Sequence, residues 1–228
     1  MLKAVLSLSS LNFIGQLGVL AFVSISSWYL GSEEYGRYAV LVSLISVGAA
    51  VSTLSIEFSI PNFEKDEREQ ISRCCAGVVF LMSVVLSIVI SMYVSNLYVF
   101  FASFFAIAGM GLSRVVEKQF IADGRTNAIG IMRLAHPSLS LVMSLVILFD
   151  FLLVGHMYFI YIYGFSIFMA GSFFYFRENN FLEVVKSCKK LSNIVPMLKT
   201  SNYLTMSSLL GSLTYNLPVL IVEKYLGP

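Results

Sequence analysis

Four side chains that can carry positive charge are spaced so that they can meet at one end of two neighbouring apolar segments. Arg114 and Lys118 are four residues apart, which places them on one face of a helix, and Glu117 lies beside them. Arg133 and His136 stand near the start of the next apolar segment. A cluster of this sign suits a phosphate-bearing ligand, because arginine offers a fork of donors and lysine a compact charge.

These charges also have an ordinary alternative role. Long cationic side chains at the ends of membrane helices reach the interface and set the topology of the chain. We favour this alternative for Lys118 and Arg125, which lie outside or at the edge of their apolar segments. Arg114 and Arg133 lie deeper, so we interpret these two as candidate ligand-binding residues.

A polar stripe runs along the first apolar segment. Ser9, Asn12 and Gln16 occupy one helical face, where a polar group is costly in a membrane and must line a cavity or bond to a neighbouring helix. Both alternatives remain open. In the second segment Glu57 is the one acid well inside, and it either pairs with an arginine or serves as a proton-coupling carboxylate. The predicted substrate-binding set is therefore Asn12, Gln16, Glu57, Arg114, Arg133 and His136.

The sequence does not contain a recognisable set of catalytic, cofactor-binding or metal-binding residues. The glycines of Gly109-Met110-Gly111 lack the third glycine and the preceding strand of a dinucleotide loop. The two histidines have no metal-ligand partner at helical spacing, and the three cysteines have no metal-site or disulfide spacing. We therefore predict no catalytic residue, no metal and no cofactor.

The elements that must position these residues are membrane helices. The chain of 228 residues is 57% apolar and only 12% charged, and its net charge of +2 does not indicate a nucleic-acid partner. Apolar segments of about 20 residues, enough to cross a ~30 Å hydrocarbon core, predict an all-α bundle in contact with the lipid bilayer. We place the seven spans at 6–30, 37–60, 74–95, 97–116, 128–149, 157–176 and 201–223, with a tight turn at Ser95-Asn96.

The charges between the spans predict their orientation. If the N-terminus is cytoplasmic, that side receives all of the 15 lysine and arginine residues except Arg37 and Lys224. Short cytoplasmic loops retain Lys and Arg, so the bias favours this orientation. It also argues against a seven-span receptor, whose N-terminus would lie outside.

The end of the chain repeats its beginning. Tyr-Leu-Gly occurs at 29–31 and at 225–227, and the same offset aligns Gly15 with Gly211 and the stripe of the first span with Thr205, Ser208 and Ser212. Spans one and seven both run from inside to outside, so the repeat is parallel. We predict a six-helix lobe at 1–176, a cytoplasmic amphipathic linker at 177–199 whose helix Pro196 ends, and the start of a second lobe at 200–228, with helix seven kinked at Pro218.

The phrase Tyr-Leu-Gly-Ser-Glu-Glu-Tyr-Gly-Arg-Tyr at 29–38, after a span that carries Asn12 and Gln16, resembles the first helix hairpin of the polysaccharide (O-antigen) flippases. These belong to the multidrug/oligosaccharidyl-lipid/polysaccharide exporter superfamily. The resemblance is strong over this hairpin and moderate over the six-span spacing and the basic linker. Gly31 and Gly36 suit the short outer turn.

The resemblance implies a two-lobe transporter of 12 or more helices in the bacterial inner membrane. Such a protein moves an undecaprenyl-diphosphate-linked oligosaccharide, the unit of O-antigen or a related surface polysaccharide, to the outer leaflet by alternating access. It implies Arg114 and Arg133 as diphosphate or sugar contacts, Asn12 and Gln16 as cavity wall, and other polysaccharide-assembly membrane proteins as partners.

The sequence departs from this family in length. It stops where a second outer loop would begin, so we expect a truncated product, one half of a split transporter or a partial sequence. One lobe lacks the opposite wall and is not expected to alternate access alone. A drug or cation exporter of the same superfamily and a polysaccharide polymerase are the alternatives; the first calls for more buried acids than Glu57, and the second for a long outer loop.

Overall fold

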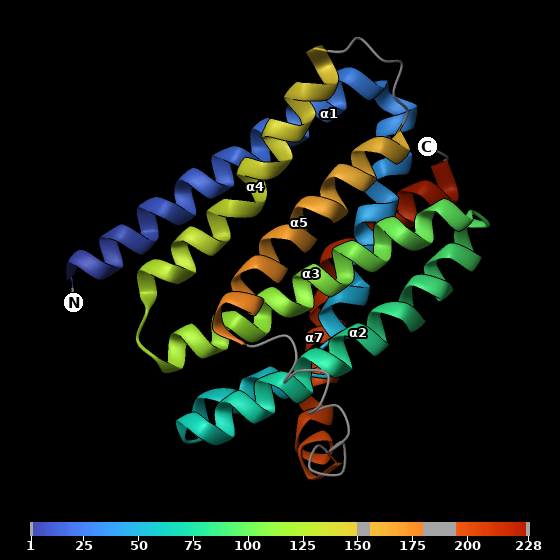
Figure 1. The fold of residues 1–228 in the computed structure, drawn as a ribbon. Coiled ribbons are helices and arrows are strands. Elements are labelled where there is room, and N and C mark those ends of the chain that lie inside the picture. The colour runs from blue at the N-terminus through green and yellow to red at the C-terminus, as the bar shows by residue number, and fades with distance from the viewer. Residues whose placement is uncertain (1, 150–155, 180–194, 227–228) are drawn as a thin grey trace.

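The computed structural model describes the backbone of residues 2–149, 156–179 and 195–226, and the side chains of 8–145, 157–179 and 201–221. Within these residues every element of secondary structure is a helix (Figure 1). The elements are α1 (Leu2–Val51), η1 (Ile56–Asn62), α2 (Lys65–Val94), α3 (Leu97–Ala122), α4 (Thr126–Phe149), α5 (His156–Glu178) and α7 (Val195–Leu226).

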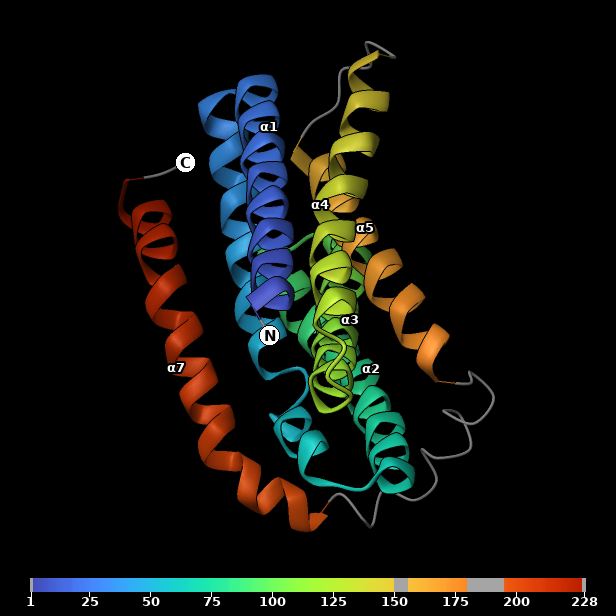
Figure 2. The ribbon, with the colours of Figure 1, turned by 90° about the vertical axis from the view of Figure 1, so that its left-hand side faces the viewer.

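Helix α1 is a hairpin of two spans. At about 1.5 Å per residue, a straight helix of its 50 residues would be about two and a half times as long as the ~30 Å hydrocarbon core is thick. The break falls at Gly31, whose φ of 70° and ψ of 177° are outside the helical range and suit a residue without a Cβ. The two arms then lie side by side (Figures 1 and 2). The predicted turn at Gly31 is confirmed, whereas Gly36 lies inside the second arm.

The second arm ends earlier than its apolar pattern predicts. The predicted span of 37–60 is helical only to Val51, and residues 56–62 form the 3-10 helix η1. Leu54 and Ser55 have φ values of 48° and 56°, which an α-helix cannot contain. At the last turn of the arm the Ser52 hydroxyl donates a hydrogen bond to the Ala49 carbonyl at 3.0 Å, where a continued helix would supply a backbone N–H. Glu57 therefore lies in η1 and not in a membrane-spanning α-helix.

The predicted tight turn between α2 and α3 is confirmed. Ser95 has a φ of 55°, and the backbone N–H of Tyr98 donates to the Asn96 side chain at 2.9 Å. This bond caps the start of α3 and lets α2 and α3 pack as antiparallel neighbours.

The centre of the bundle is α3, which packs between α2 and α5 (Figure 1). Small residues bring α3 and α5 into backbone contact: Gly171 lies against the Gly109 carbonyl, and Gly164 lies against the Ala102 carbonyl. Membrane helices associate closely where glycine and alanine replace larger side chains. This close contact fixes the position of α3 along the bundle axis, and with it the position of the polar residues of α3.

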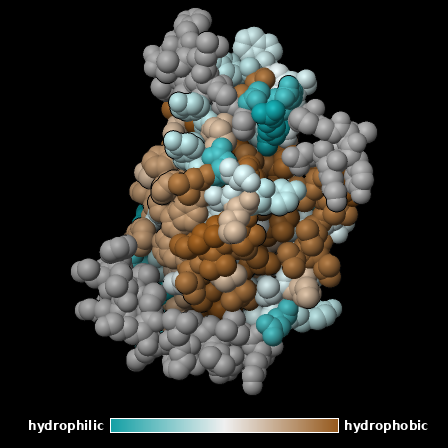
Figure 3. Space-filling model, turned by 90° about the vertical axis from the view of Figure 1, so that its right-hand side faces the viewer, coloured by the Kyte–Doolittle hydropathy of each residue, from teal (hydrophilic) through white to brown (hydrophobic). Residues whose placement is uncertain are grey.

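The outer surface is apolar across its middle. Among the described residues, six helices are long and apolar enough to cross a membrane, and one of these is the bent α1. Figure 3 shows a broad apolar surface with polar surface towards both ends. On α2 its exposed members are Leu81, Val84, Val85, Ile88, Val89 and Met92. The chain is thus a multi-pass membrane protein of the helical-bundle class.

Basic residues mark one end of the bundle. Lys65 starts α2, Arg125 lies in the turn between α3 and α4, and Arg177 is in the last turn of α5. Figure 1 places these element ends together, at the lower end of the view, whereas the Gly31 turn lies at the opposite end. The orientation that places this end in the cytoplasm rests on the same charges and stays a prediction.

Helix α7 lies along the outside of the bundle and runs in the same direction as the first arm of α1 (Figures 1 and 2). Its Ser212 hydroxyl donates to the Ser46 carbonyl on the second arm at 3.4 Å. Pro196 lies in the first turn of α7, which begins at Val195, and proline is tolerated there; its role as the end of the linker helix stays a prediction. The centre of the predicted linker, 180–194, lies outside the described residues.

Candidate functional site

Arg133 joins three helices near the basic end of the bundle. From α4 it contacts Glu117 of α3, with Nη2 2.6 Å from Oε1, and it donates through Nη1 to Oδ1 of Asn12 on α1 at 3.3 Å. Its side chain is 44% exposed and that of Glu117 is 24% exposed. The guanidinium is therefore paired yet still open to a ligand, with donors left over from its five N–H groups.

Arg133 lies seven residues beyond Thr126, the first residue of α4. At 1.5 Å per residue this is about 10 Å along the helix, clear of the end where a side chain could simply reach water. Gln16 is exposed on the first arm of α1, one turn beyond Asn12. Asn12, Gln16 and Arg133 thus form a polar strip where α1 meets α4, and Glu117 extends it onto α3.

Arg114 has a different position. Its Nη1 donates to the Ala49 carbonyl at 2.7 Å, in the last turn of the second arm of α1. Carbonyls at a helix C-terminus lack intrahelical donors and carry partial negative charge, so a cation stabilises them. The charges of Glu57 and Glu117 also act on this guanidinium. Arg114 therefore holds the end of α1 against α3.

Glu57 is buried, with 3% of its surface exposed. Its Oε2 has no hydrogen-bond partner within the described part of the chain. A buried carboxylate oxygen without a donor is costly, so this group is a candidate for binding a proton or a cation. Nearby, the Lys118 ammonium lies 4.4 Å from the centre of the Phe58 ring.

His136 lies apart from the arginines. Its ring meets Tyr163 of α5 edge-on, at 5.5 Å between centroids, and its Nε2 has no partner among the described side chains. It lines a hollow of about 280 Å³ between both arms of α1 and helices α4 and α5. The polar members of that lining are Tyr35, Tyr38, Ser43, His136, Ser140 and Tyr163.

Two hydroxyl groups of the polar stripe on α7 donate hydrogen bonds to backbone carbonyls. Thr205 donates to the Ser201 carbonyl of its own helix, and Ser212 donates to the Ser46 carbonyl of α1. The Ser212 bond, which crosses to α1, fits the packing alternative for the stripe on α7, whereas Asn12 and Gln16 lie on the accessible strip. Among the described residues, His, Cys, Asp and Glu side chains do not gather in the groups of three that a metal site requires.

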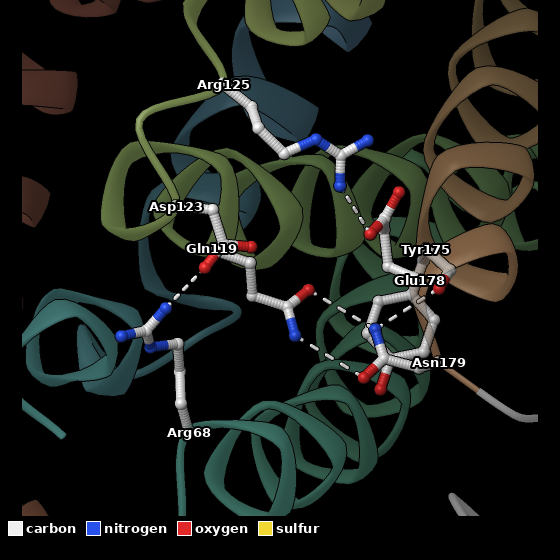
Figure 4. Close-up of polar contacts among 7 residues, drawn as sticks. All are labelled: Arg68, Gln119, Asp123, Arg125, Tyr175, Glu178 and Asn179. Carbon is white, nitrogen blue, oxygen red and sulfur yellow. Dashed lines mark hydrogen bonds and ion pairs between the residues drawn. The ribbon is translucent and has the colours of Figure 1, made fainter. Parts of the chain in front are cut away.

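A polar lock at the basic end was not predicted. Gln119 of α3 and Asn179, just after α5, exchange two amide hydrogen bonds of 3.4 and 3.2 Å while buried (Figure 4). Asn179 also donates to the Tyr175 carbonyl at 3.2 Å. Both amides lie just beyond the predicted ends of their spans, at 116 and 176, and nothing in the sequence pattern indicates a pairing between residues 60 apart.

Two ion pairs surround this lock (Figure 4). Arg68 of α2 contacts Asp123 at 2.5 Å, and Arg125 contacts Glu178 at 2.6 Å. The hydrogen bond that Arg125 donates to the Glu178 carboxylate raises the pKa of the Arg125 guanidinium. Arg125 is thus an end-of-helix residue, in agreement with the alternative role predicted for it.

The fold and the site define a class, a multi-pass helical membrane protein with a paired, accessible arginine among its spans. Comparison with protein-family models, with curated proteins and with solved structures found no match for the chain.

Proposed function

We propose that the chain forms the first lobe of a flippase for lipid-linked oligosaccharides, with Arg133 as its diphosphate contact. The observation that carries the proposal is the strip formed by Arg133, Glu117, Asn12 and Gln16. A half-exposed guanidinium among membrane spans is costly, and such residues usually mark a substrate path.

The chemistry of the strip fits such a substrate. Glu117 balances the charge of Arg133 while the site is empty, and a diphosphate offers the guanidinium a stronger, bidentate partner. Asn12 and Gln16 supply amide donors and acceptors for sugar hydroxyls. The apolar outer surface leaves the polyprenyl tail in the bilayer.

The direction of the helices also supports a two-lobe arrangement. The first arm of α1 and α7 run in the same direction, as a parallel repeat requires (Figure 2). In this proposal α7 starts a second lobe, and the strip on α1 and α4 forms one wall of a cavity that opens alternately to the two sides of the bacterial inner membrane.

Photo-crosslinking tests the proposal. The chain is placed in phosphatidylcholine vesicles with an undecaprenyl-diphosphate oligosaccharide that carries a photoreactive sugar. We expect labelling of α1 and α4 that unlabelled substrate competes away, and an about tenfold loss with Arg133→Gln, because hydrogen bonds to charged groups contribute about 1.5–3 kcal/mol.

Arg37→Gln is the matched control. Arg37 is 48% exposed and pairs with Glu33 at 2.8 Å, much as Arg133 pairs with Glu117, but it lies near the opposite end of the bundle. Equal labelling of Arg133→Gln and Arg37→Gln, or no competed labelling at all, would overturn the proposal.

A second candidate is an exporter of cationic compounds, and the observation that favours it is the buried Glu57 with its unpartnered Oε2. Such a protein would bind a fluorescent lipophilic cation, and Glu57→Gln would abolish this binding while Arg133→Gln would not. The flippase proposal expects no saturable binding of the cation.

A further inference from the structure

A hollow of about 430 Å³ opens at the basic end of the bundle, on the α3–α4 turn and the end of α5. Its lining joins charged, polar and apolar groups. They include Phe120, Arg125, Asn127, Phe174, Arg177 and Glu178. It is separate from the strip around Arg133, which lies where α4 meets α1 and α3.

Of the two arginines that line this hollow at the basic end, one is paired with a glutamate and the other can bind an anion. Arg125 is held by Glu178 at 2.6 Å and lies over the Phe120 ring at 4.6 Å. Arg177 is exposed and has no ion-pair partner within residues 8–145, 157–179 and 201–221. Two arginines and one glutamate give the lining a net charge of +1, which matches a singly charged phosphodiester.

A second hollow, of about 310 Å³, lies along the seam between α4 and α5. Phe174 lines both. Apart from Ser166 its lining is apolar, and it follows one face of each helix at steps of four residues. On α4 these are Ala135, Leu139 and Met143, and on α5 they are Phe165, Met169 and Phe173.

The dimensions suit one lipid of one leaflet. The two hollows follow α4 from Asn127 to Met143, about 24 Å of helix at 1.5 Å per residue. That exceeds about 15 Å, half of the ~30 Å hydrocarbon core, by enough to include a headgroup. Leu139, Met169 and Phe173 are exposed, so the seam is open to the bilayer along its length.

We propose that these hollows together bind an anionic phospholipid of the leaflet at the basic end. Its phosphodiester lies at Arg177 beside the Arg125–Glu178 pair, and one acyl chain lies in the α4–α5 seam. A free phosphate would leave the apolar seam uncovered, whereas a zwitterionic lipid would bring a cation to a lining that is already positive. The site does not depend on the proposed function.

The experiment uses the whole chain in phosphatidylcholine vesicles doped with phosphatidylglycerol that carries a diazirine in its acyl chain. We expect crosslinks in peptides of α4 and α5 around Leu139 and Met169, competed by phosphatidylglycerol better than by phosphatidylcholine. Arg177→Gln should lower the labelling about fivefold, the effect of one basic residue near an anionic headgroup.

Two controls separate the site from general effects. Met169→Trp fills the seam from an exposed position and should remove the labelling, whereas Val142→Trp, also exposed on α4 but outside the lining, should leave it unchanged. Arg37→Gln controls for loss of one surface charge.

Three outcomes would overturn the inference. Labelling spread evenly over all helices would show only bilayer contact, and equal labelling of Arg177→Gln and Arg37→Gln would remove the headgroup contact. Competition by a polyprenyl diphosphate at concentrations far below those of phosphatidylglycerol would assign the seam to a different lipid.

Discussion

Helices α5 and α7 both contain glycine, and each packs against another helix, α5 against α3 and α7 against α1. They differ in how much of their surface this packing buries. In the most apolar 18-residue stretch of each helix, 56% of residues are buried in α5 and none in α7. Gly171 of α5 touches the backbone of α3, whereas nothing approaches within 4 Å of a Cβ added at Gly211 of α7. The α3–α5 seam thus holds the fold, and α7 is attached to it from outside.

The comparison also explains where polar residues are tolerated. Between α3 and α5 the buried amides Gln119 and Asn179 are paired with each other. On α7, Thr205 and Thr214 bond to carbonyls of their own helix, at 3.0 and 2.8 Å. The pairing of the two amides avoids the cost of about 1–3 kcal/mol that an unpaired buried polar group carries.

The sharpest way to break the comparison is to add the same side chain to both helices. Gly171→Val places a branched side chain against the Gly109 carbonyl and the Ser113 hydroxyl, and backbone cannot move aside cheaply. We expect a loss of at least about 3 kcal/mol in the free energy of unfolding, at the upper end for overpacked cores. Thermal unfolding in detergent measures this loss. It can be monitored by the reaction of Cys74 and Cys75 with a thiol reagent, because both thiols are buried in the folded protein.

Gly211→Val is the matched control for this change. Its Cβ meets open space, so the melting temperature should stay within about 2 °C of the parent protein. Equal melting temperatures for Gly171→Val and Gly211→Val would show that α5 and α7 do not differ in how tightly they are packed.

The buried amide pair gives the next largest effect. Gln119→Leu leaves the Asn179 amide without its side-chain partner, and we expect a loss of about 1–3 kcal/mol. The double variant Gln119→Leu/Asn179→Leu should recover part of this loss, because neither side then holds an unpaired amide. A double-mutant cycle in detergent checks the coupling; additive losses would contradict it.

Several local features of the fold could be predicted from the sequence. The Gly31 turn and the Ser95-Asn96 turn depend on residues that are adjacent in the chain, and both were found where the pattern placed them. The basic end followed from charge alone. The end of the second arm at Val51 could not be predicted, since Arg114 binds the Ala49 carbonyl across 65 residues of sequence.

The candidate site was predicted in part. Arg133 and Asn12 do meet, but His136 does not join them. Residues three apart on a helix differ by about 60° in direction, given 3.6 residues per turn. That angle is enough to direct Arg133 towards α3 and His136 towards Tyr163 of α5, and only the packing of the neighbouring helices decides it.

The third prediction separates stability from binding at the strip. Arg133→Gln removes an ion pair whose partners are 44% and 24% exposed, and partly exposed pairs contribute about 0–1 kcal/mol. The melting temperature in detergent should therefore change little, although crosslinking to a lipid-linked diphosphate falls. A large loss of stability would instead identify Arg133 as a residue that holds α1, α3 and α4 together.

The smallest effect is expected at the contact between α7 and α1. The Ser212 hydroxyl reaches the Ser46 carbonyl at 3.4 Å, which is long for an O–H···O bond, so Ser212→Ala should cost only a few tenths of a kcal/mol. Ser140→Ala is the control, because that hydroxyl is buried and bonds to Ser166 of α5 at 2.6 Å, and its loss should cost about 1–2 kcal/mol. Thermal unfolding of both variants in one detergent gives the comparison. If Ser212→Ala were the more costly of the two, α7 would be part of the packed core and its exposed glycine would need another explanation.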